Sequence, residues 1–291
     1  MEGSSMNIGV GGASGKLGQA VLRELQARAP GHRLIAISRT PEQAPIGVEG
    51  RLGDYDRPET LAKAYAGLDR LLLIPTSDMR PGMRGDQNIA GIRGAVAAGV
   101  KHIVLMSAAG TREEEEPAIG ASYWRGEQEL IKTAPKWTVL RMNYYAESLL
   151  DEVQTSAAQG ALAGIAENRV AFVSRDDIAA AAAGILTGDG HAGAIYNATG
   201  SRSYTGAERA ALISEVMGKP LGYITVPAET LRAGMIEAGL PDFVANAVVG
   251  IQSIFADGAL DIVTGDIEKL AGRPPRELRD LVSERFKPSV K

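Results

Sequence analysis

Residues 7–30, NIGVGGASGKLGQAVLRELQARAP, place three glycines at intervals of three between an apolar run and an amphipathic segment. The apolar run is typical of a strand, and the segment after the glycines has helical spacing. At such a junction the missing Cβ atoms let the backbone approach a pyrophosphate, and the free N–H groups of the helix favour an anion. The pattern predicts a dinucleotide loop made by Gly12, Ala13, Ser14, Gly15, Lys16, Leu17 and Gly18. The alternative is a glycine-rich turn without a ligand.

Strand-like and helical patterns alternate outward from this stretch through the first half of the chain. Expected strands cover residues 7–11, 33–38, 47–52, 70–75, 101–107 and 137–141, and expected helices cover 16–28, 59–66, 87–98 and 122–132. Runs such as 71–74 and 103–106 are apolar throughout, as in parallel strands that helices cover on both faces. The sequence therefore predicts an α/β fold with a doubly wound parallel sheet.

The domain organisation follows from where this alternation weakens. Residues 1–5 are short and polar before a second methionine, and we interpret them as an expression-tag remnant. Residues 6–145 are expected to form a dinucleotide-binding Rossmann domain, to which strands and a helix from about 169–199 return. Residues 200–291 contain Gly-Leu-Pro and Gly-Arg-Pro-Pro breaks, and we expect them to form mainly a smaller α/β cap that binds the substrate.

Three local signals mark helix ends in the second half of the chain. Ser174 with Asp177 is a capping pair before RDDIAAAAAGIL, and it follows a strand-like run at 169–174. Thr205 with Glu208 is a capping-box pattern before RAALISEVMG, which Gly218 ends. A strand is expected between them, at residues 193–199.

Charge and composition argue against several classes of function. The formal net charge is −4, without a cluster of lysine or arginine, so we expect neither a nucleic-acid nor a membrane partner. The chain has no cysteine, which excludes disulfides, thiolate zinc sites and iron–sulfur clusters, and fits a cytoplasmic protein. Its three histidines lack ligand spacing, so we expect no metal.

The end of the second expected strand distinguishes between two cofactors. A carboxylate there would bind the ribose 2′-hydroxyl of NAD, but the strand ends in Ser38 and Arg39. A guanidinium there is suited to the 2′-phosphate of NADP, with a hydroxyl group beside it. We therefore predict NADP(H). Asp54, after the third strand, has two open roles: accepting a hydrogen bond from the adenine amino group, or capping the helix that begins near Pro58.

With these residues placed, the chain resembles the NmrA-like branch of the atypical short-chain dehydrogenases/reductases. Within that branch it is most similar to the bacterial NADPH:quinone oxidoreductase and triphenylmethane reductase group. The motifs that carry the resemblance span nearly the whole chain: GGASGKLG, IAISRT, GDYDRPETLAKAYAGLDRLLLI, AGVKHIVLMSA, TVLRMNYYAESL, VSRDDIAAAAAGIL and EKLAGRPP. The resemblance implies a Rossmann domain that binds NADP(H), a small C-terminal cap and a substrate pocket over the nicotinamide.

The resemblance also implies roles for individual positions. Residues 12–18 match the pyrophosphate loop, and Arg39 matches the 2′-phosphate site. The tip of the fourth strand beside the ribose corresponds to Pro75, Thr76 and Ser77. The loop near the nicotinamide and the substrate corresponds to Asn143, Tyr144 and Tyr145. Arg141, just before this loop, is expected to be a structural ion-pair partner.

The usual proton-transfer pair of short-chain dehydrogenases is incomplete in this sequence. Ser107 ends the fifth strand, and Tyr123 follows sixteen residues later, as candidate catalytic residues. The fourth residue after Tyr123 is Glu127, where the ordinary enzymes have a lysine that stabilises the phenolate. A carboxylate cannot do this, so Tyr123 is either a proton donor by other means or a wall of the pocket.

Two hypotheses of function remain, with a third as the weakest. The first is an NADPH-dependent reductase that passes a hydride directly to a planar electrophile such as a quinone, between walls formed by Tyr123, Trp124, Tyr144 and Tyr145. The second is a non-catalytic NADP(H)-binding redox sensor of the NmrA type. The third, a nucleotide-sugar epimerase or ketoreductase, lacks the Tyr-x-x-x-Lys pair. A monomer or a homodimer is expected.

The acidic run TREEEEP, residues 111–117, follows the fifth strand. Adjacent carboxylates repel one another and stay in water, so the run is expected to be a mobile surface loop. The alternative is a lid that favours cationic acceptors.

Overall fold

The computed structural model describes residues 5–116, 118–156 and 159–286. Residues 1–4 of the expected tag remnant, and Pro117 of the acidic run, lie outside the described residues. Strands and helices alternate from the first described residues, and two further small sheets follow in the second half of the chain.

The central layer is a parallel sheet of seven strands in the order β3-β2-β1-β4-β5-β6-β9. Its strands are β1 (Asn7–Gly11), β2 (Arg33–Ser38), β3 (Glu49–Leu52), β4 (Arg70–Leu73), β5 (His102–Ala108), β6 (Trp137–Met142) and β9 (Ala194–Ala198). The order reverses between β1 and β4, which leaves a crevice beside β1 at the carboxyl ends of the strands. The doubly wound fold predicted from the sequence is confirmed.

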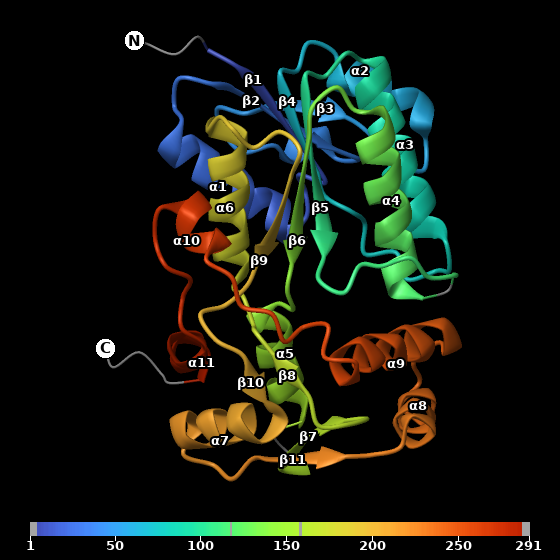
Figure 1. Cartoon of the computed structure of the whole chain (residues 1–291), viewed down its shortest axis with the longest axis vertical. Coiled ribbons are helices and arrows are strands. Elements are labelled where there is room, and N and C mark those ends of the chain that lie inside the picture. The colour runs from blue at the N-terminus through green and yellow to red at the C-terminus, as the bar shows by residue number, and fades with distance from the viewer. Residues whose placement is uncertain (1–4, 117, 157–158, 287–291) are drawn as a thin grey trace.

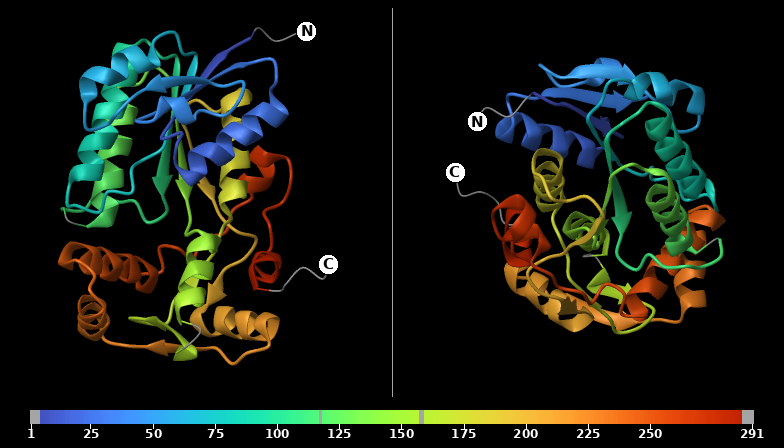
Figure 2. Two further views of the ribbon diagram at one scale, coloured as in Figure 1. Left: turned by 180° about the vertical axis from the view of Figure 1, so that it is seen from behind. Right: turned by 45° about the horizontal axis from the view of Figure 1, so that its top comes forward.

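Helices cover both faces of this sheet (Figures 1 and 2). One face carries α1 (Lys16–Arg28), α6 (Arg175–Thr187) and α10 (Asp266–Ala271). The other carries α2 (Leu61–Tyr65), α3 (Met83–Ala97) and α4 (Ile119–Thr133). Two short 3₁₀ helices, η1 (Pro41–Gln43) and η2 (Pro58–Thr60), flank β3. Each face buries its own apolar core, and β4 and β5 contribute to both because their side chains alternate between the faces.

Helix α3 begins four residues before the predicted start at Gln87. Gly82, with φ of +74°, precedes it, and Gly85 in its first turn lies against Ser122 and Arg125 of α4. A Cβ atom on Gly85 would lie 2.7 Å from the Arg125 guanidinium. Contact with α4 therefore orders a first turn that lacks the apolar periodicity of a helix, which is why the sequence pattern missed it.

The remaining elements lie together beyond the carboxyl edge of the sheet (Figure 1). They are α5 (Ala146–Ser156), β7 (Ala161–Gly164), β8 (Arg169–Val170), β10 (Tyr204–Thr205), α7 (Gly206–Met217), β11 (Gly222–Thr225), α8 (Ala228–Glu237), α9 (Asp242–Ala256) and α11 (Leu278–Phe286). Strand β7 pairs with β11, and β8 with β10. A third apolar core fills this region.

The helix-end signals in this half of the chain are confirmed. The Ser174 hydroxyl accepts a hydrogen bond from the Asp177 amide at 3.0 Å, Thr205 and Glu208 form a capping box, and Gly218 ends α7 in the left-handed conformation. The run 169–174 differs from its expectation. Only β8 is a strand there, and it pairs with β10 outside the main sheet, whereas α6 and β9 do lie in the main layers.

None of the helices in the described ranges is long and apolar enough to cross a bilayer.

Candidate functional site

The glycine loop joins β1 to α1 through a turn that excludes side chains. Gly12 has a φ of +76°, and a Cβ atom on Gly18 would lie 2.4 Å from the Gly12 carbonyl oxygen. The Ala13 amide donates to the Ile37 carbonyl of β2 at 3.1 Å, which fixes the loop against the sheet. Ala13 and Leu17 are buried, whereas Ser14, Gly15 and Lys16 are exposed.

The start of α1 fits an anionic group. No side chain caps Gly15, and the first turn contains no acidic residue. The first amide groups of a helix lack partners within it, so they are available here to a ligand together with the positive end of the helix dipole. Lys16 is exposed and makes no ion pair with the described residues. The loop therefore has both the space and the charge for a pyrophosphate.

The end of β2 places a second positive charge at the same edge of the sheet. Arg39 is exposed and makes neither a hydrogen bond nor an ion pair within the described part of the chain. The buried Ser38 hydroxyl accepts a hydrogen bond from the Thr40 amide at 3.2 Å. Asp54 has its carboxylate bound to the Asp56 amide at 3.1 Å and to Arg57 at 3.3 Å, in the turn that leads to η2. These contacts lie within the turn itself, and neither η2 nor α2 has a side-chain cap, so the capping role expected for Asp54 is not the contact that it makes.

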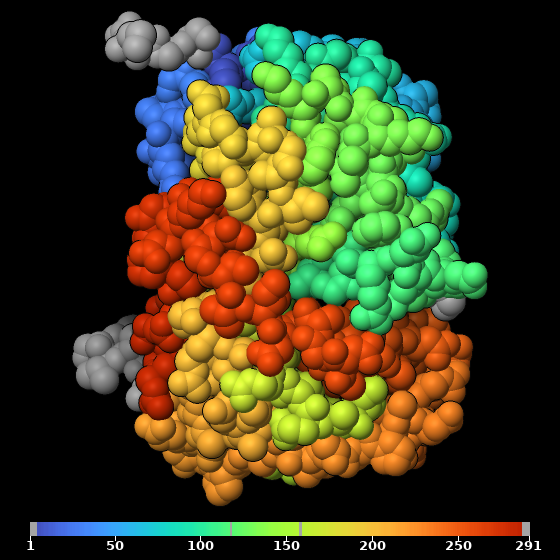
Figure 3. All heavy atoms as spheres, in the orientation of Figure 1, coloured from blue at the N-terminus to red at the C-terminus, as the bar shows by residue number. Residues whose placement is uncertain are grey.

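A cleft of about 740 Å³ separates the carboxyl ends of β4, β5 and β6 from α9. Its lining is mainly apolar, with Ile74, Ala108, Ala109 and Met142 on the side of the sheet. Ile74 also lies against Gly12, since a Cβ on Gly12 would approach Ile74 to 3.2 Å. The glycine loop and the cleft are therefore adjacent. On the face shown in Figure 3, α9 forms the lower border of the cleft.

The tip of β4 and the wall formed by α4 meet in this cleft. Pro75, Thr76 and Ser77 line it, and the Thr76 hydroxyl donates to the Gln87 side chain. Tyr123 lines the opposite side, and the guanidinium carbon of Arg84 lies 5.1 Å from its ring centre. Trp124, considered as a fourth aromatic wall, is not among the residues that line the cleft.

Ser107 lies below the floor of the cleft in a buried polar cluster. Its hydroxyl donates to Glu127 Oε1 at 2.6 Å, and Arg141 binds both oxygens of the same carboxylate at 2.9 and 2.6 Å. Ser107 is fully buried, Glu127 is 1% exposed, and neither lines the cleft. The hydrogen bonds that Arg141 donates to Glu127 raise the pKa of Arg141. The Ser107 hydroxyl is thus committed to Glu127, and Arg141 is an ion-pair partner as expected.

The loop after β6 positions two tyrosines beside the cleft. The Asn143 side chain donates to the Leu260 carbonyl at 3.0 Å and accepts from the Tyr144 amide at 2.7 Å. Tyr144 packs edge-on against Phe255, with ring centres 4.8 Å apart. Burial raises the pKa of Tyr144 to about 12 and also raises that of Tyr145. Both remain neutral phenols that can form a flat wall.

The acidic run is tied to its neighbours at two of its four glutamates. Glu114 binds Arg112 at 2.6 Å, and Arg112 also binds Asp257 just after α9, at 3.0 Å. Glu116 accepts hydrogen bonds from the Ser122 hydroxyl at 2.9 Å and from the Gly82 amide at 3.2 Å. These contacts link α4, α3 and α9 around one end of the cleft.

Several residues that line the cleft were not predicted from the sequence. Helix α9 contributes Phe243, Ala247, Gly250, Ile251 and Ile254, and the segment after β4 contributes Asp78, Met79, Arg80 and Arg84. The signal for α9 was present as a mostly apolar helix, FVANAVVGIQSIFA, in a region expected to be a cap. The segment after β4 carries no comparable signal, because isolated charged residues occur in most surface loops.

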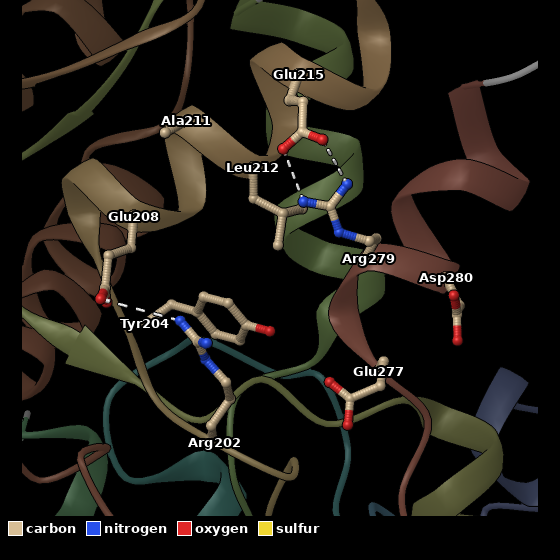
Figure 4. A pocket seen from close by; sticks show the side chains of 9 residues that line it. All are labelled: Arg202, Tyr204, Glu208, Ala211, Leu212, Glu215, Glu277, Arg279 and Asp280. Carbon is tan, nitrogen blue, oxygen red and sulfur yellow. Dashed lines mark hydrogen bonds and ion pairs between the residues drawn. The ribbon is translucent and has the colours of Figure 1, made fainter.

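A second hollow, of about 520 Å³, lies between α7 and α11 (Figure 4). Its arginines face carboxylates: Arg279 binds Glu215 at 2.7 Å, and Arg202 lies 3.9 Å from Glu208 and over the Tyr204 ring. Both arginines of this hollow are therefore paired with carboxylates of the protein itself. Among the described residues, no group of three or more histidine, aspartate or glutamate side chains is arranged to hold a metal.

Comparison with known proteins gives a consistent result. A family model described as NAD(P)H-binding matches residues 12–189. Quinone oxidoreductase 2 of Escherichia coli (strain K12) is 30% identical over 285 residues, which cover 96% of this chain and 98% of that protein.

Two solved structures are similar over nearly the whole chain. The NADPH complex of the Escherichia coli NADPH-dependent quinone oxidoreductase QOR2 has a TM-score of 0.89 and 30% identity, covering 96% of this chain and 100% of that one. Triphenylmethane reductase of Citrobacter sp. has a TM-score of 0.86 and 31% identity, covering 97% and 100%.

Proposed function

The chain belongs to the NAD(P)H-binding family of NmrA-like proteins, and on that basis we propose that it is an NADPH-dependent reductase that transfers a hydride directly to a quinone or a similar conjugated electrophile. The quinone oxidoreductase and the triphenylmethane reductase that it resembles are both reductases with solved NADP(H) complexes. The class of acceptor is the part that we propose here.

The residues that would hold NADP(H) follow from the loop geometry. The uncapped start of α1 and the glycines at 12, 15 and 18 fit the pyrophosphate, and Lys16 adds charge beside it. Arg39 and Ser38 would bind the 2′-phosphate, because a guanidinium without an internal partner can form a bidentate pair with a phosphate. Pro75, Thr76, Ser77, Asn143, Tyr144 and Tyr145 would surround the ribose and the nicotinamide. When bound, NADPH supplies the hydride.

One observation supports a quinone-like acceptor over a ketone. Glu127 stands where the short-chain enzymes have their lysine, and it is bound to Ser107 and Arg141 instead of facing Tyr123. Reduction of an ordinary ketone gives a strongly basic alkoxide that needs a matched proton donor. The site lacks the pair of side chains that performs this step.

A quinone places a smaller demand on the protein. Addition of one hydride to a quinone gives a hydroquinone anion, whose conjugate acid resembles a phenol with a pKa of about 10. Bulk water can supply the proton that completes the hydroquinone once the anion has left the cleft. The contribution of the protein is then to orient a flat acceptor between Tyr123 and Tyr144 and to exclude water with the apolar face of α9.

We further propose that residues 200–291 act mainly as the substrate-binding cap. Helix α9 supplies one wall of the cleft, and Leu260 after it accepts the hydrogen bond from Asn143 that fixes the tyrosine loop. The cap would thereby select the shape of the acceptor, while residues 6–145 would bind the cofactor.

The decisive test is steady-state NADPH oxidation with a panel of quinones, cationic triarylmethane dyes and simple ketones, with NADH measured in parallel. We expect turnover with quinones, slower turnover or none with ketones, and a preference for NADPH. Tight NADPH binding without turnover of any acceptor would contradict the proposal and indicate a redox sensor. Faster turnover of ketones than of quinones would contradict the proposed class of acceptor.

A further inference from the structure

The charged residues of the cleft are almost completely paired. Three carboxylates line it, and each lies beside an arginine. Asp78 binds Arg80 through Nε at 3.0 and 3.1 Å, which lowers the pKa of Asp78 to about 2. Glu116 lies 3.5 Å from Arg125, which also binds Asp86 at 2.6 Å, and Asp242 is bound to Arg232. Each carboxylate that lines the cleft therefore has a guanidinium beside it.

Arg84 is the exception among the residues described. Its Nε donates to the Thr76 carbonyl at 3.1 Å, and its guanidinium carbon lies 5.1 Å from the Tyr123 ring centre. Within the described ranges it makes no ion pair with a carboxylate, and its two terminal nitrogens have no hydrogen-bond acceptor. The side chain is half-buried and lines the cleft.

The two contacts of Arg84 hold its guanidinium without neutralising it. The hydrogen bond at Nε and the tyrosine ring restrict the side chain, so little rotamer freedom remains to be lost when a ligand binds. The terminal nitrogens form the edge of the fork that binds a carboxylate, sulfonate or phosphate in a bidentate manner. In a mainly apolar cleft such a pair is less screened by water than at an open surface.

We propose that Arg84 is the specificity-determining residue of the cleft and that it selects planar acceptors bearing an anionic substituent such as a carboxylate or a sulfonate. This inference rests on the proposed reductase function, which it narrows to one class of acceptor. A lid of free glutamates would instead favour cationic acceptors. The glutamate of the acidic run that lines the cleft is Glu116, and its carboxylate already accepts hydrogen bonds from the protein.

The test compares a matched pair of acceptors, 1,2-naphthoquinone and 1,2-naphthoquinone-4-sulfonate, in the wild type and in Arg84→Gln. We expect the ratio of kcat/KM for the sulfonated quinone to that for the neutral quinone to fall about tenfold in Arg84→Gln, as for the loss of a charge-assisted hydrogen bond. The change is expected in KM for the acceptor. Arg84→Lys should restore part of the ratio, and added salt should reduce it in the wild type.

Arg93→Gln is the matched control. Arg93 lies on the same helix, pairs with Glu129 at the surface, and does not line the cleft. An unchanged ratio in Arg84→Gln would overturn the inference and leave the reductase proposal standing. A rise in KM for NADPH, with both acceptors affected equally, would overturn it by making Arg84 a cofactor contact.

Equilibrium binding separates this inference from the reductase function. The affinities of both quinones are measured calorimetrically in the presence of NADP⁺, in which no turnover occurs. Stronger binding of the sulfonated quinone that is lost in Arg84→Gln supports the inference even if no acceptor is reduced. Equal binding of the two quinones by the wild type, or no binding of either, contradicts it.

Discussion

The two edges of the parallel sheet use their charged side chains differently. At the amino edge, Arg70 donates to the Ile185 and Leu186 carbonyls at the end of α6 and binds Asp189. Nearby, Asp69 binds Lys101 and the Asn7 amide. At the carboxyl edge, three cations have no carboxylate partner among the described residues: Lys16, Arg39 and Arg84.

This difference separates stabilisation from recognition. A charge that the protein satisfies internally holds elements together, whereas a charge left without a partner beside a cleft is available to a ligand. In open α/β sheets, ligands bind outside the carboxyl ends of the strands, where unpaired charges are expected. Substitutions at the two edges of the sheet should therefore have different consequences.

Glu127 is a residue of the carboxyl edge that should behave as a purely structural one. Glu127→Ala leaves Arg141 and Ser107 without their partner in a buried site, and we expect the free energy of unfolding to fall by about 3 kcal/mol. Urea denaturation measures this change. Glu129→Ala on the same helix is the control, because its pair with the exposed Arg93 should contribute about 1 kcal/mol or less. Equal effects of the two variants would contradict this assignment.

His102 should make the amino edge sensitive to acid. Burial lowers the pKa of His102 to about 4, and its Nε2 lies 2.8 Å from the Thr138 hydroxyl, which itself donates to the His191 carbonyl. A histidine in the unfolded chain has a pKa of about 6.5, so the unfolded state takes up the proton first as the pH falls. The stability that the neutral His102 contributes is complete above about pH 6.5 and is lost between about pH 6.5 and pH 4.

We expect this loss to reach at most about 3 kcal/mol. Urea denaturation at about pH 7 and about pH 4.5 measures it as the difference between the wild type and His102→Gln. The variant should show a shallower dependence of stability on pH than the wild type. Parallel profiles for the wild type and His102→Gln would show that His102 does not carry the acid sensitivity.

Arg39 tests the opposite kind of residue, a cation without a partner. Arg39→Ala should weaken NADPH binding about tenfold while changing NADH binding less, because only NADPH carries the 2′-phosphate. Fluorescence titration of both cofactors gives the two affinities. Arg23→Ala, at an exposed arginine of α1, controls for a general loss of positive charge. Equal losses for the two cofactors would remove the 2′-phosphate assignment.

Tyr123 should give the smallest effect. No hydrogen bond of its hydroxyl to a described residue is present, and quinone reduction does not require a strong acid, so Tyr123→Phe should keep kcat within about tenfold. Stopped-flow measurement of single turnovers separates the hydride step from product release. A much larger decrease would mean that the hydroxyl is a proton donor, and it would restore the ketoreductase alternative.

The local features of this fold were predictable because they depend on neighbouring residues. The glycine spacing, the apolar strands and the caps at Ser174 and Thr205 all involve residues within a few positions of one another. Strand β7 was not predictable, since Ala-Leu-Ala-Gly has no strand preference and is paired by β11 about 60 residues later. The prediction that 169–174 joins the main sheet was wrong for a similar reason, as β10 pairs with β8 instead.

The sequence alone determined the doubly wound sheet, the family resemblance, the glycine loop between β1 and α1 and the cation at Arg39. Only the tertiary structure decided which charges remain free, because pairing depends on distances between residues far apart in the chain. Glu127 of α4 forms an ion pair with Arg141 of β6. Glu116 lies beside Arg125 and accepts a hydrogen bond from the Gly82 amide. Arg84 has no carboxylate partner among the described residues, and no pattern of neighbours in the sequence distinguishes it from an ordinary surface arginine.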